Sequence, residues 1–333
     1  MNDSTVFVTG ATGFLGRYLL PALSERYSHV RVLVRHPDAP ANAWLRTIPN
    51  LDIITGDLHN ANALAAGMAG ASFVAHAAGL FRFWGDATGF ERVNVQGTQA
   101  MLEAARAAGI RRFVHVSTFA VVGTPLPGAI VDEAHPVQPQ DPYQRSKLEA
   151  ERRVLAAGAA GDMDVVVLRP GAFYGPHGTY AFNRLFFHDP MRGLIMQMDG
   201  GKYIIPPVFV PDVAQAVALA LEHGRDGEIY NICGQPLSHR AAYDIVCREA
   251  KLRFPRLNLP GWMGIMASQI MERVASITHR EPFYPLNMRT YVYNDWRVSS
   301  EKAERELGIR FTPFEDGARQ TIAWYRAGRP QVS

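Results

Sequence analysis

Tyr143 and Lys147 lie four residues apart, and a phenol and an ammonium at this spacing could handle a proton together. Asp141 suits a helix N-cap and Pro142 suits the first helical position, so a helix is expected to start here. One helical turn then places Tyr143 and Lys147 on the same face. A nearby lysine favours the phenolate and should lower a phenol pKa that starts at about 10. Tyr143 is therefore a candidate acid/base for an alcohol or carbonyl oxygen.

A second motif lies near the N-terminus, where a short apolar stretch runs into Gly10, Gly13 and Gly16 and then into a helical pattern. Glycines allow a tight turn and let backbone N–H groups approach a phosphate. The helix N-terminus adds unpaired N–H groups and partial positive charge. Together these features predict a dinucleotide site. Each motif alone has a plain alternative: a glycine turn that binds no ligand, and a solvated helix face carrying tyrosine and lysine.

The elements that must position these residues alternate between strand and helix. Short apolar runs occur at residues 6–9, 30–34, 51–55, 73–76, 113–116 and 165–168, and helical patterns at 14–26, 90–108 and 142–157. Consecutive apolar residues are typical of parallel strands that are buried on both faces. The sequence therefore predicts an α/β fold, a Rossmann-type doubly wound parallel sheet with ligands bound at the carboxyl ends of its strands.

The alternation breaks after Gly175, where prolines, glycines and aromatic residues become frequent. We expect residues 1–177 to form the dinucleotide-binding domain and residues 178–333 to form mainly a smaller, C-terminal substrate-binding lobe. Within about 205–235, strands near 208–210 and 228–231 are expected to return to the main sheet. Two helical patterns, at 300–307 and 315–327, end the chain, each followed by glycine.

Composition excludes several classes of protein. The net charge of +3 comes without a lysine or arginine block, so no nucleic-acid partner is expected. Cys233 and Cys247 lack metal-ligand spacing, which predicts no metal site and fits a reducing compartment. Strand residues begin by Thr5 without a basic or apolar leader, so the expected location is cytoplasmic.

The most membrane-like stretch is residues 257–274, which are rich in leucine, methionine and isoleucine. The stretch is too short and, with Glu272 and Arg273, too charged to span a bilayer. A buried helix of the second lobe is the favoured interpretation. Peripheral contact with a lipid-like surface is the alternative.

Further motifs follow one another in a recognisable order. They are Gly56-Asp57-Leu58, Ala77-Ala78-Gly79, Asn94 with Gly97-Thr98, Val116-Ser117-Thr118, Leu168-Arg169-Pro170-Gly171, Val210-Pro211-Asp212-Val213-Ala214 and the run from Ser300 to Gly308. With them the chain resembles, over nearly its whole length, the extended short-chain dehydrogenases/reductases of the NAD-dependent epimerase/dehydratase superfamily. It looks closest to the 3β-hydroxysteroid dehydrogenase and dihydroflavonol reductase branch, and it is also similar to hopanoid-associated sugar epimerases.

This resemblance implies roles for individual residues. Thr118, preceded by Ser117, falls on the family's catalytic serine/threonine position, where a hydroxyl orients the substrate oxygen against Tyr143. Lys147 would also hold the nicotinamide ribose, and Asn94 would brace the site. The full implied cofactor set is Gly10, Thr12, Gly13, Phe14, Leu15, Gly16, Arg35, Asp57, Leu58, Ala77, Ala78, Gly79, Asn94, Tyr143, Lys147, Pro170 and Phe173. The family also implies a homodimer formed through helices 90–108 and 142–157.

The choice of cofactor depends on the end of the second strand. An acidic residue there binds the ribose 2′-hydroxyl of NAD, whereas arginine accepts the 2′-phosphate of NADP. Arg35 holds this position, so NADP(H) is favoured. Asp38 could loop back to the ribose, which leaves NAD(H) open, and Arg35 would then be a plain surface charge.

Aromatic residues near the expected site suggest an apolar, ring-containing small-molecule substrate. The candidates are Phe81, Phe83, Trp84, Tyr174, Tyr180 and Phe186, together with Thr118 at the reacting oxygen. Their alternative is ordinary core packing. Residues 202–209 lack the arginine with which nucleotide-sugar members hold a pyrophosphate.

The leading function is therefore an NAD(P)-dependent oxidoreductase that interconverts an alcohol and a ketone. A nucleotide-sugar epimerase or dehydratase with tightly bound NAD is the first alternative. A non-catalytic cofactor sensor is the second, and it would not need Tyr143, Lys147 and Thr118.

Overall fold

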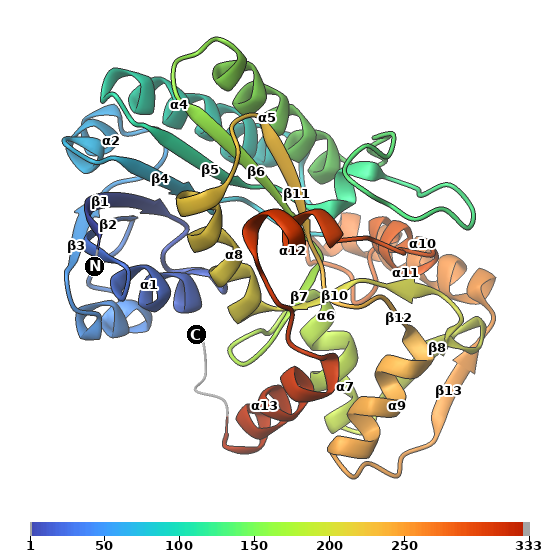
Figure 1. Cartoon of the computed structure of the whole chain (residues 1–333). Helices are drawn as coiled ribbons and strands as arrows, with labels where there is room; N and C mark the ends of the chain where they lie inside the picture. Colours follow the sequence, from blue (N-terminus) through green and yellow to red (C-terminus); the bar gives the residue numbers. More distant parts are fainter. Residues whose placement is uncertain (1, 329–333) are drawn as a thin grey trace.

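Seven parallel strands form the central sheet of the computed structural model, which describes residues 2–328 (Figure 1). In spatial order they are β3 (Leu51–Thr55), β2 (Tyr27–Val34), β1 (Asn2–Thr9), β4 (Phe73–His76), β5 (Arg112–Val116), β6 (Asp164–Pro170) and β11 (Glu228–Ile232). Because the strand order reverses between β1 and β4, the crevice expected to bind ligands opens at the carboxyl ends of these two strands. The prediction of a doubly wound Rossmann-type sheet is confirmed.

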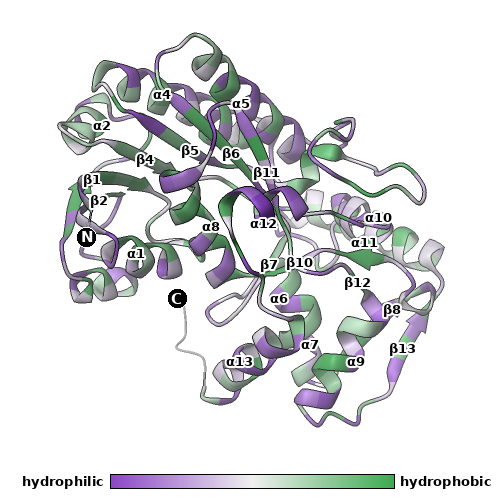
Figure 2. Ribbon diagram, viewed as in Figure 1, coloured by the Kyte–Doolittle hydropathy of each residue, from purple (hydrophilic) through white to green (hydrophobic). Residues whose placement is uncertain are grey.

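Helices cover both faces of this sheet (Figure 1). One face packs against α1 (Gly16–Ser24), α8 (Val210–His223) and α12 (Glu301–Leu307), and the other against α2 (Ala61–Met68), α4 (Gly97–Ala107) and α5 (Pro142–Ala159). In β1, Val6 and Val8 belong to the first core and Phe7 to the second. Successive strand residues point to opposite faces, so both faces require apolar side chains. Apolar residues accordingly concentrate along the inner strands (Figure 2).

The C-terminal lobe carries three two-stranded pairings and several helices. The strand pairs are β7 (Ala172–Tyr174) with β10 (Pro207–Phe209), β9 (Ile204–Ile205) with β12 (Leu237–Ser238), and β8 (Ile195–Met198) with β13 (Arg256–Leu259). The main helices are α9 (His239–Glu249), α10 (Gly261–Thr278), α11 (Arg289–Val292) and α13 (Phe314–Arg326). A further helical stretch, α6 (Ala181–Asn183), η4 (Arg184–His188) and α7 (Asp189–Met191), covers β7.

One of the two strands expected to return to the main sheet does not. β11 joins the sheet beside β6, but β10 pairs with β7 outside it. The chain leaves the sheet after Pro170, where Ala172 N donates to Pro206 O. A Cβ at Gly171 would lie 2.3 Å from that carbonyl, so glycine permits the close approach that starts the separate pair.

The expectation of a buried helix over residues 257–274 is wrong. α10 forms, but its large apolar residues point outward, and Trp262 and Ile277 are 63% and 80% exposed. Its buried residues are small, among them Gly264, Ser268 and Ala275. No helix in the described part of the chain is long and apolar enough to cross a membrane.

Candidate active site

A cavity of about 1020 Å³ starts at the carboxyl ends of β1 and β4 and extends into the C-terminal lobe. The glycine turn after β1 forms one wall. Gly10 has a φ of +78°, and a Cβ there would lie 2.6 Å from the backbone of Ala77. At Gly16 a Cβ would lie 2.1 Å from Ala11 O. Only glycine fits these positions, and the turn presents its exposed Thr12 and Gly13 to the cavity, as a phosphate cradle requires.

Most residues of the expected cofactor set line this cavity. They are Gly10, Thr12, Gly13, Phe14, Leu15, Arg35, Asp57, Leu58, Ala77, Ala78, Gly79, Tyr143, Lys147 and Phe173. Gly16, Asn94 and Pro170 are not among the described lining residues. Pro170 ends β6 behind the wall, and Gly16 is the buried first residue of α1.

Asn94 acts as a brace within a π-helical turn, η2 (Glu91–Gln96), that runs into α4. Its Oδ1 accepts from Leu80 N at 2.7 Å, and its Nδ2 donates to Leu80 O at 3.1 Å and to Ser146 Oγ at 2.9 Å. These bonds tie the segment after β4 to α5. Asn94 therefore fixes the distance between the cofactor wall and the helix that carries Tyr143.

Arg35 lies exposed just after β2 and lines the cavity. Asp38, the alternative ribose ligand, pairs with Arg46 at 2.7 Å and is not among the described lining residues. Sequence reasoning missed Arg17, which also lines the cavity and stacks over the Trp44 ring at 4.8 Å. Its place in the first turn of α1, directly after Gly16, was the available signal.

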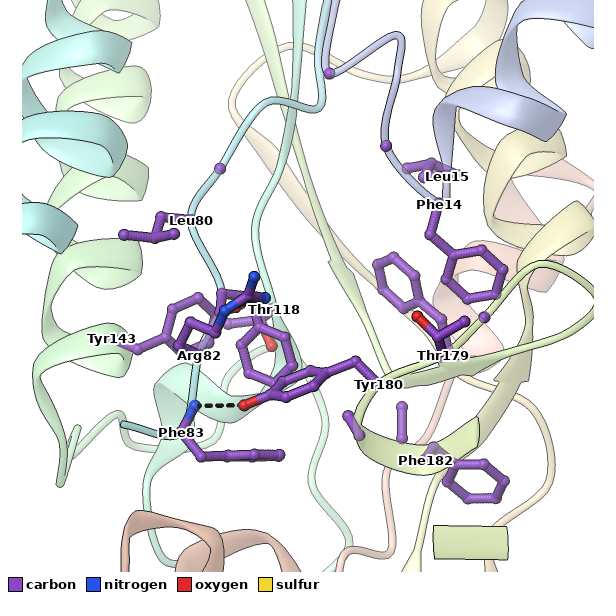
Figure 3. A pocket seen from close by; sticks show the side chains of 18 of the residues that line it. Phe14, Leu15, Leu80, Arg82, Phe83, Thr118, Tyr143, Thr179, Tyr180 and Phe182 are labelled. Atoms are coloured by element: carbon purple, nitrogen blue, oxygen red, sulfur yellow. Dashed lines mark hydrogen bonds between the residues drawn. The ribbon is translucent and has the colours of Figure 1, made fainter. Parts of the chain in front are cut away.

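Tyr143, Thr118 and Lys147 meet on the opposite wall (Figure 3 labels Tyr143 and Thr118). Asp141 accepts from Gln144 N at 2.8 Å, so α5 begins where its cap predicts. The Tyr143 phenol lies beside Thr118, whose hydroxyl lowers the phenol pKa by less than burial raises it (Figure 3). Burial among apolar neighbours raises the pKa of Tyr143. The expected lowering of this pKa by Lys147 is therefore absent from the protein alone.

The Lys147 ammonium contacts a backbone carbonyl and the imidazole of a buried histidine. Its Nζ donates to Val116 O at 2.7 Å and lies 3.4 Å from His115 Nε2. Burial lowers the pKa of Lys147 to about 8, against a smaller raising effect of Glu151. Burial, followed by the charge of Lys147, holds the pKa of His115 well below its usual range. His115 is thus neutral, and Lys147 carries the charge at this site.

Ser117 lines the cavity but its hydroxyl turns away from Tyr143. It donates to Glu151 Oε2 at 2.8 Å, and Glu151 forms a buried ion pair with Arg169. Ser117 and Thr118 follow β5, and their side chains reach different parts of α5: Ser117 contacts Glu151, about two turns beyond Tyr143, whereas Thr118 lies beside Tyr143. The expectation that Ser117 is catalytic is therefore wrong. Its hydroxyl instead connects the end of β5 to α5 and, through the Glu151–Arg169 ion pair, to β6.

An aromatic group closes the far side of the cavity (Figure 3). The Phe81 ring lies 4.8 Å from that of Tyr143 and 5.0 Å from that of Phe83. The Phe83 N–H donates to Tyr180 OH at 3.1 Å, and Arg82 stacks over the Tyr180 ring at 5.2 Å. The segment after β4 and the loop before α6 thus share one wall.

Two expected substrate residues lie elsewhere. Phe81, Phe83, Tyr180 and Phe186 line the cavity, whereas Trp84 and Tyr174 are not among its described lining residues. Tyr174 is 1% exposed and packs in the lobe core, with its ring 5.8 Å from that of Phe187. For Tyr174, the alternative interpretation of ordinary core packing is therefore correct.

The lobe contributes lining residues that sequence reasoning missed. They are Leu194, Met196, Met198, Ile205, His239, Tyr243, Met288, Tyr291 and Val292. They come from β8, β9, α9, the segment after α10 and α11, far apart along the chain. No local pattern marked them, because only the folded lobe brings these elements together.

Comparisons with known proteins identify the family of the chain. The model of the NAD dependent epimerase/dehydratase family matches residues 6–233. The chain is 34% identical to a 4-hydroxy-2-methyl-3-oxo-4-farnesyl-3,4-dihydroquinoline-1-oxide ketoreductase of Stigmatella aurantiaca, over 91% of this chain and 90% of that one. It is 30% identical to a ceramide reductase of Caulobacter vibrioides, over 97% and 94%.

Solved structures share the fold over the whole chain. The crystal structure of gox2253 superposes with a TM-score of 0.83 at 28% identity, covering 99% of this chain and all (100%) of that one. A DesIV double mutant, a dTDP-glucose 4,6-dehydratase from Streptomyces venezuelae with NAD and DAU bound, gives 0.76 at 26% identity, covering 97% of each chain. The chain belongs to the NAD-dependent epimerase/dehydratase family, the extended short-chain dehydrogenases/reductases, and is an NAD(P)-dependent oxidoreductase.

Proposed function

We propose that this family member interconverts an alcohol and a ketone on an apolar, ring-containing substrate, with Tyr143 as the acid/base. The observation that carries the proposal is the Tyr143 phenol beside the Thr118 hydroxyl on the wall of an aromatic-lined cavity (Figure 3). The names of two relatives, a ketoreductase and a ceramide reductase, support carbonyl reduction on substrates with large apolar parts. A place near the 3β-hydroxysteroid dehydrogenase and dihydroflavonol reductase branch fits the same chemistry.

Each residue then has a defined task. The nicotinamide, when bound between the glycine turn and α5, supplies or accepts the hydride. Thr118 orients the substrate oxygen, and Tyr143 gives that oxygen a proton in reduction or takes it in oxidation. A phenol with a raised pKa is protonated at neutral pH, which is the form that can give a proton to a carbonyl oxygen. Lys147 holds the ribose hydroxyls. Asn94 keeps the segment after β4 at a fixed distance from α5.

The cavity gives a reason to prefer an apolar substrate to a nucleotide sugar. From residue 171 onward, none of the described lining residues is lysine or arginine, and Asp189 adds a carboxylate. A sugar nucleotide brings a diphosphate into this part of the site, and a diphosphate needs cationic partners. Methionine and aromatic side chains instead suit hydrocarbon rings.

A binding and turnover panel tests the proposal. Hydroxysteroids, aromatic ketones and UDP-sugars are offered with NADPH or NADP⁺ while nicotinamide absorbance is followed, and calorimetry measures binding of UDP and the steroids. Turnover or binding of ring-containing apolar compounds is expected. Micromolar binding of UDP with no binding of any steroid would promote the epimerase or dehydratase alternative.

We further propose that Arg35, with Arg17 beside it on the cavity wall, favours NADP(H) over NAD(H). Both side chains line the cavity, Arg17 from α1 directly after the glycine turn and Arg35 from the end of β2, and a guanidinium group at the end of the second strand suits the 2′-phosphate of NADP. Asp38 is engaged by Arg46, which leaves the ribose without a carboxylate from this segment.

Cofactor affinity should depend on pH through Lys147. Its pKa of about 8 means that the ammonium loses its proton as the pH rises through that value, and hydrogen bonds from a charged donor are lost with it. We expect NADH, which has no 2′-phosphate to titrate, to bind more weakly above about pH 8. Fluorescence titration of NADH across neutral and alkaline pH measures this.

The matched variant is Lys147→Met, which keeps the length of the side chain and removes the charge. It should bind NADH weakly at every pH and show no step near the pKa. An equal step in wild type and variant would contradict the assigned role of Lys147. Burial keeps Tyr143 protonated over this range, so the phenol does not contribute a step of its own.

A further inference from the structure

α10 presents a row of large apolar residues to solvent. We call these residues the outer stripe of α10: Trp262, Met266, Ile270, Val274 and Ile277, which are 63%, 47%, 54%, 54% and 80% exposed. Steps of four, four, four and three residues place all of them on one helical face. A helix with a purely structural role would bury its apolar face, so the exposed stripe indicates a surface that binds a partner.

The inner side of α10 packs against residues that line the cavity. A Cβ at Gly264 would lie 3.2 Å from Met198, which lines the cavity, and 2.3 Å from Tyr293 OH. Met271 packs against the cluster that contains Phe83, Tyr284 and Met288. The same helix therefore supports residues of the cavity wall on its inner side and carries the outer stripe on its solvent side.

Apolar exposure continues to the rim of the cavity. Leu194 and Phe283 both line the cavity, yet they are 41% and 42% exposed. Phe254 and Leu257, 48% and 50% exposed, precede α10 and pack beside β8 through the β8–β13 pairing. Exposed apolar residues therefore lie before and after α10 in the chain, in addition to the outer stripe on the helix itself.

The charges around the stripe are mainly positive. Residues 251–283 contain five lysine and arginine residues and two glutamates. Both glutamates are hydrogen-bonded within the protein: Glu272 accepts from Leu286 N at 2.7 Å, and Glu281, itself exposed, accepts from Tyr180 OH. Within residues 2–328, Arg253, Arg273 and Arg280 form no ion pair. This combination of apolar stripe and free arginines complements an anionic lipid surface.

We propose that the outer stripe of α10 docks on an anionic phospholipid bilayer, with the cavity rim facing the lipid. The stripe would enter the boundary between headgroups and acyl chains, and Arg273 would extend to the phosphates. A two-fold contact with a second copy fits less well. It would bury Arg273 against its own copy, and no carboxylate on the stripe could pair with it.

Vesicle flotation of the full chain tests the proposal. Vesicles of phosphatidylcholine mixed with phosphatidylglycerol should carry the protein, and vesicles of phosphatidylcholine alone should carry much less. The double variant Ile270→Ser/Ile277→Ser should partition about 10- to 100-fold more weakly, because two large apolar side chains no longer enter the lipid. The matched control is Leu126→Ser/Ile130→Ser, which alters two apolar residues of similar exposure (56% and 67%) in the loop before α5, outside the outer stripe, and should bind as wild type does.

A second readout reports depth. Brominated lipids should quench the fluorescence of wild type more than that of Trp262→Phe, since Trp262 lies on the stripe. Neither measurement uses a substrate, so the docking surface and the proposed function fail or succeed separately.

Three results would overturn the proposal. One is no flotation with either lipid mixture. Another is equal flotation of wild type and Ile270→Ser/Ile277→Ser, with unchanged melting temperature and NADPH binding showing that the variant is folded. The third is a dimer without vesicles that the same variant dissociates, which would assign the stripe to a second copy.

Discussion

Replacing Tyr143 by phenylalanine is expected to lower turnover by about 10²–10⁴-fold, the range typical of a general acid or base. The ring stays, so its contacts with Phe81 at 4.8 Å and Phe90 at 6.0 Å remain and the site keeps its shape. What is lost is the phenol proton and the hydroxyl that lies beside Thr118. Cofactor affinity should therefore change little, and steady-state turnover with fluorescence titration of NADPH measures both quantities.

Tyr291→Phe provides the matched control. Tyr291 also lines the cavity, but its hydroxyl is already engaged by Asp141 Oδ2 at 3.3 Å. This variant should keep most of the turnover. Near-wild-type turnover in Tyr143→Phe would remove Tyr143 from the mechanism, whereas equal losses in both variants would indicate that the helix start, and not the proton, matters.

Arg35→Ala is expected to weaken NADPH binding by roughly 10- to 150-fold and to leave NADH binding nearly unchanged. A charge-assisted hydrogen bond contributes about 1.5–3 kcal/mol, and about 1.4 kcal/mol corresponds to a factor of ten. Because Arg35 is exposed, raised salt should also weaken NADPH binding more than NADH binding. Titration of both cofactors against wild type and variant measures the effect.

Arg46→Ala serves as the control for charge alone. Arg46 is an exposed arginine on the same side of the molecule, but it pairs with Asp38 and is not among the described cavity-lining residues. It should leave the affinity for NADPH unchanged. If wild type already prefers NADH, or if Arg35→Ala loses both cofactors equally, Arg35 is a surface charge and Asp38 becomes the candidate ribose ligand.

Local features of the sequence determined the parts of the site that depend on neighbouring residues. The glycine turn follows from backbone conformation at Gly10, and the start of α5 follows from the Asp141 cap and Pro142. The strands of the main sheet were visible because residues buried on both faces must be apolar in succession. Parallel strands end at one edge, which is why Arg35, Asp57 and Thr118 could be expected at a common cavity.

The tertiary structure alone decided which side chains face the cavity. Ser117 and Thr118 are adjacent hydroxyls, and only the Glu151–Arg169 pair behind β5 shows that Ser117 turns away. Tyr174 is aromatic like Phe81, yet it packs inside the lobe. α10 has an apolar pattern that reads as a core helix, but small residues such as Gly264 contact the protein and its large ones face outward. Periodicity along the sequence shows that a helix has an apolar face. The segments that pack on that face lie far away in the sequence, and they contact it only in the folded protein.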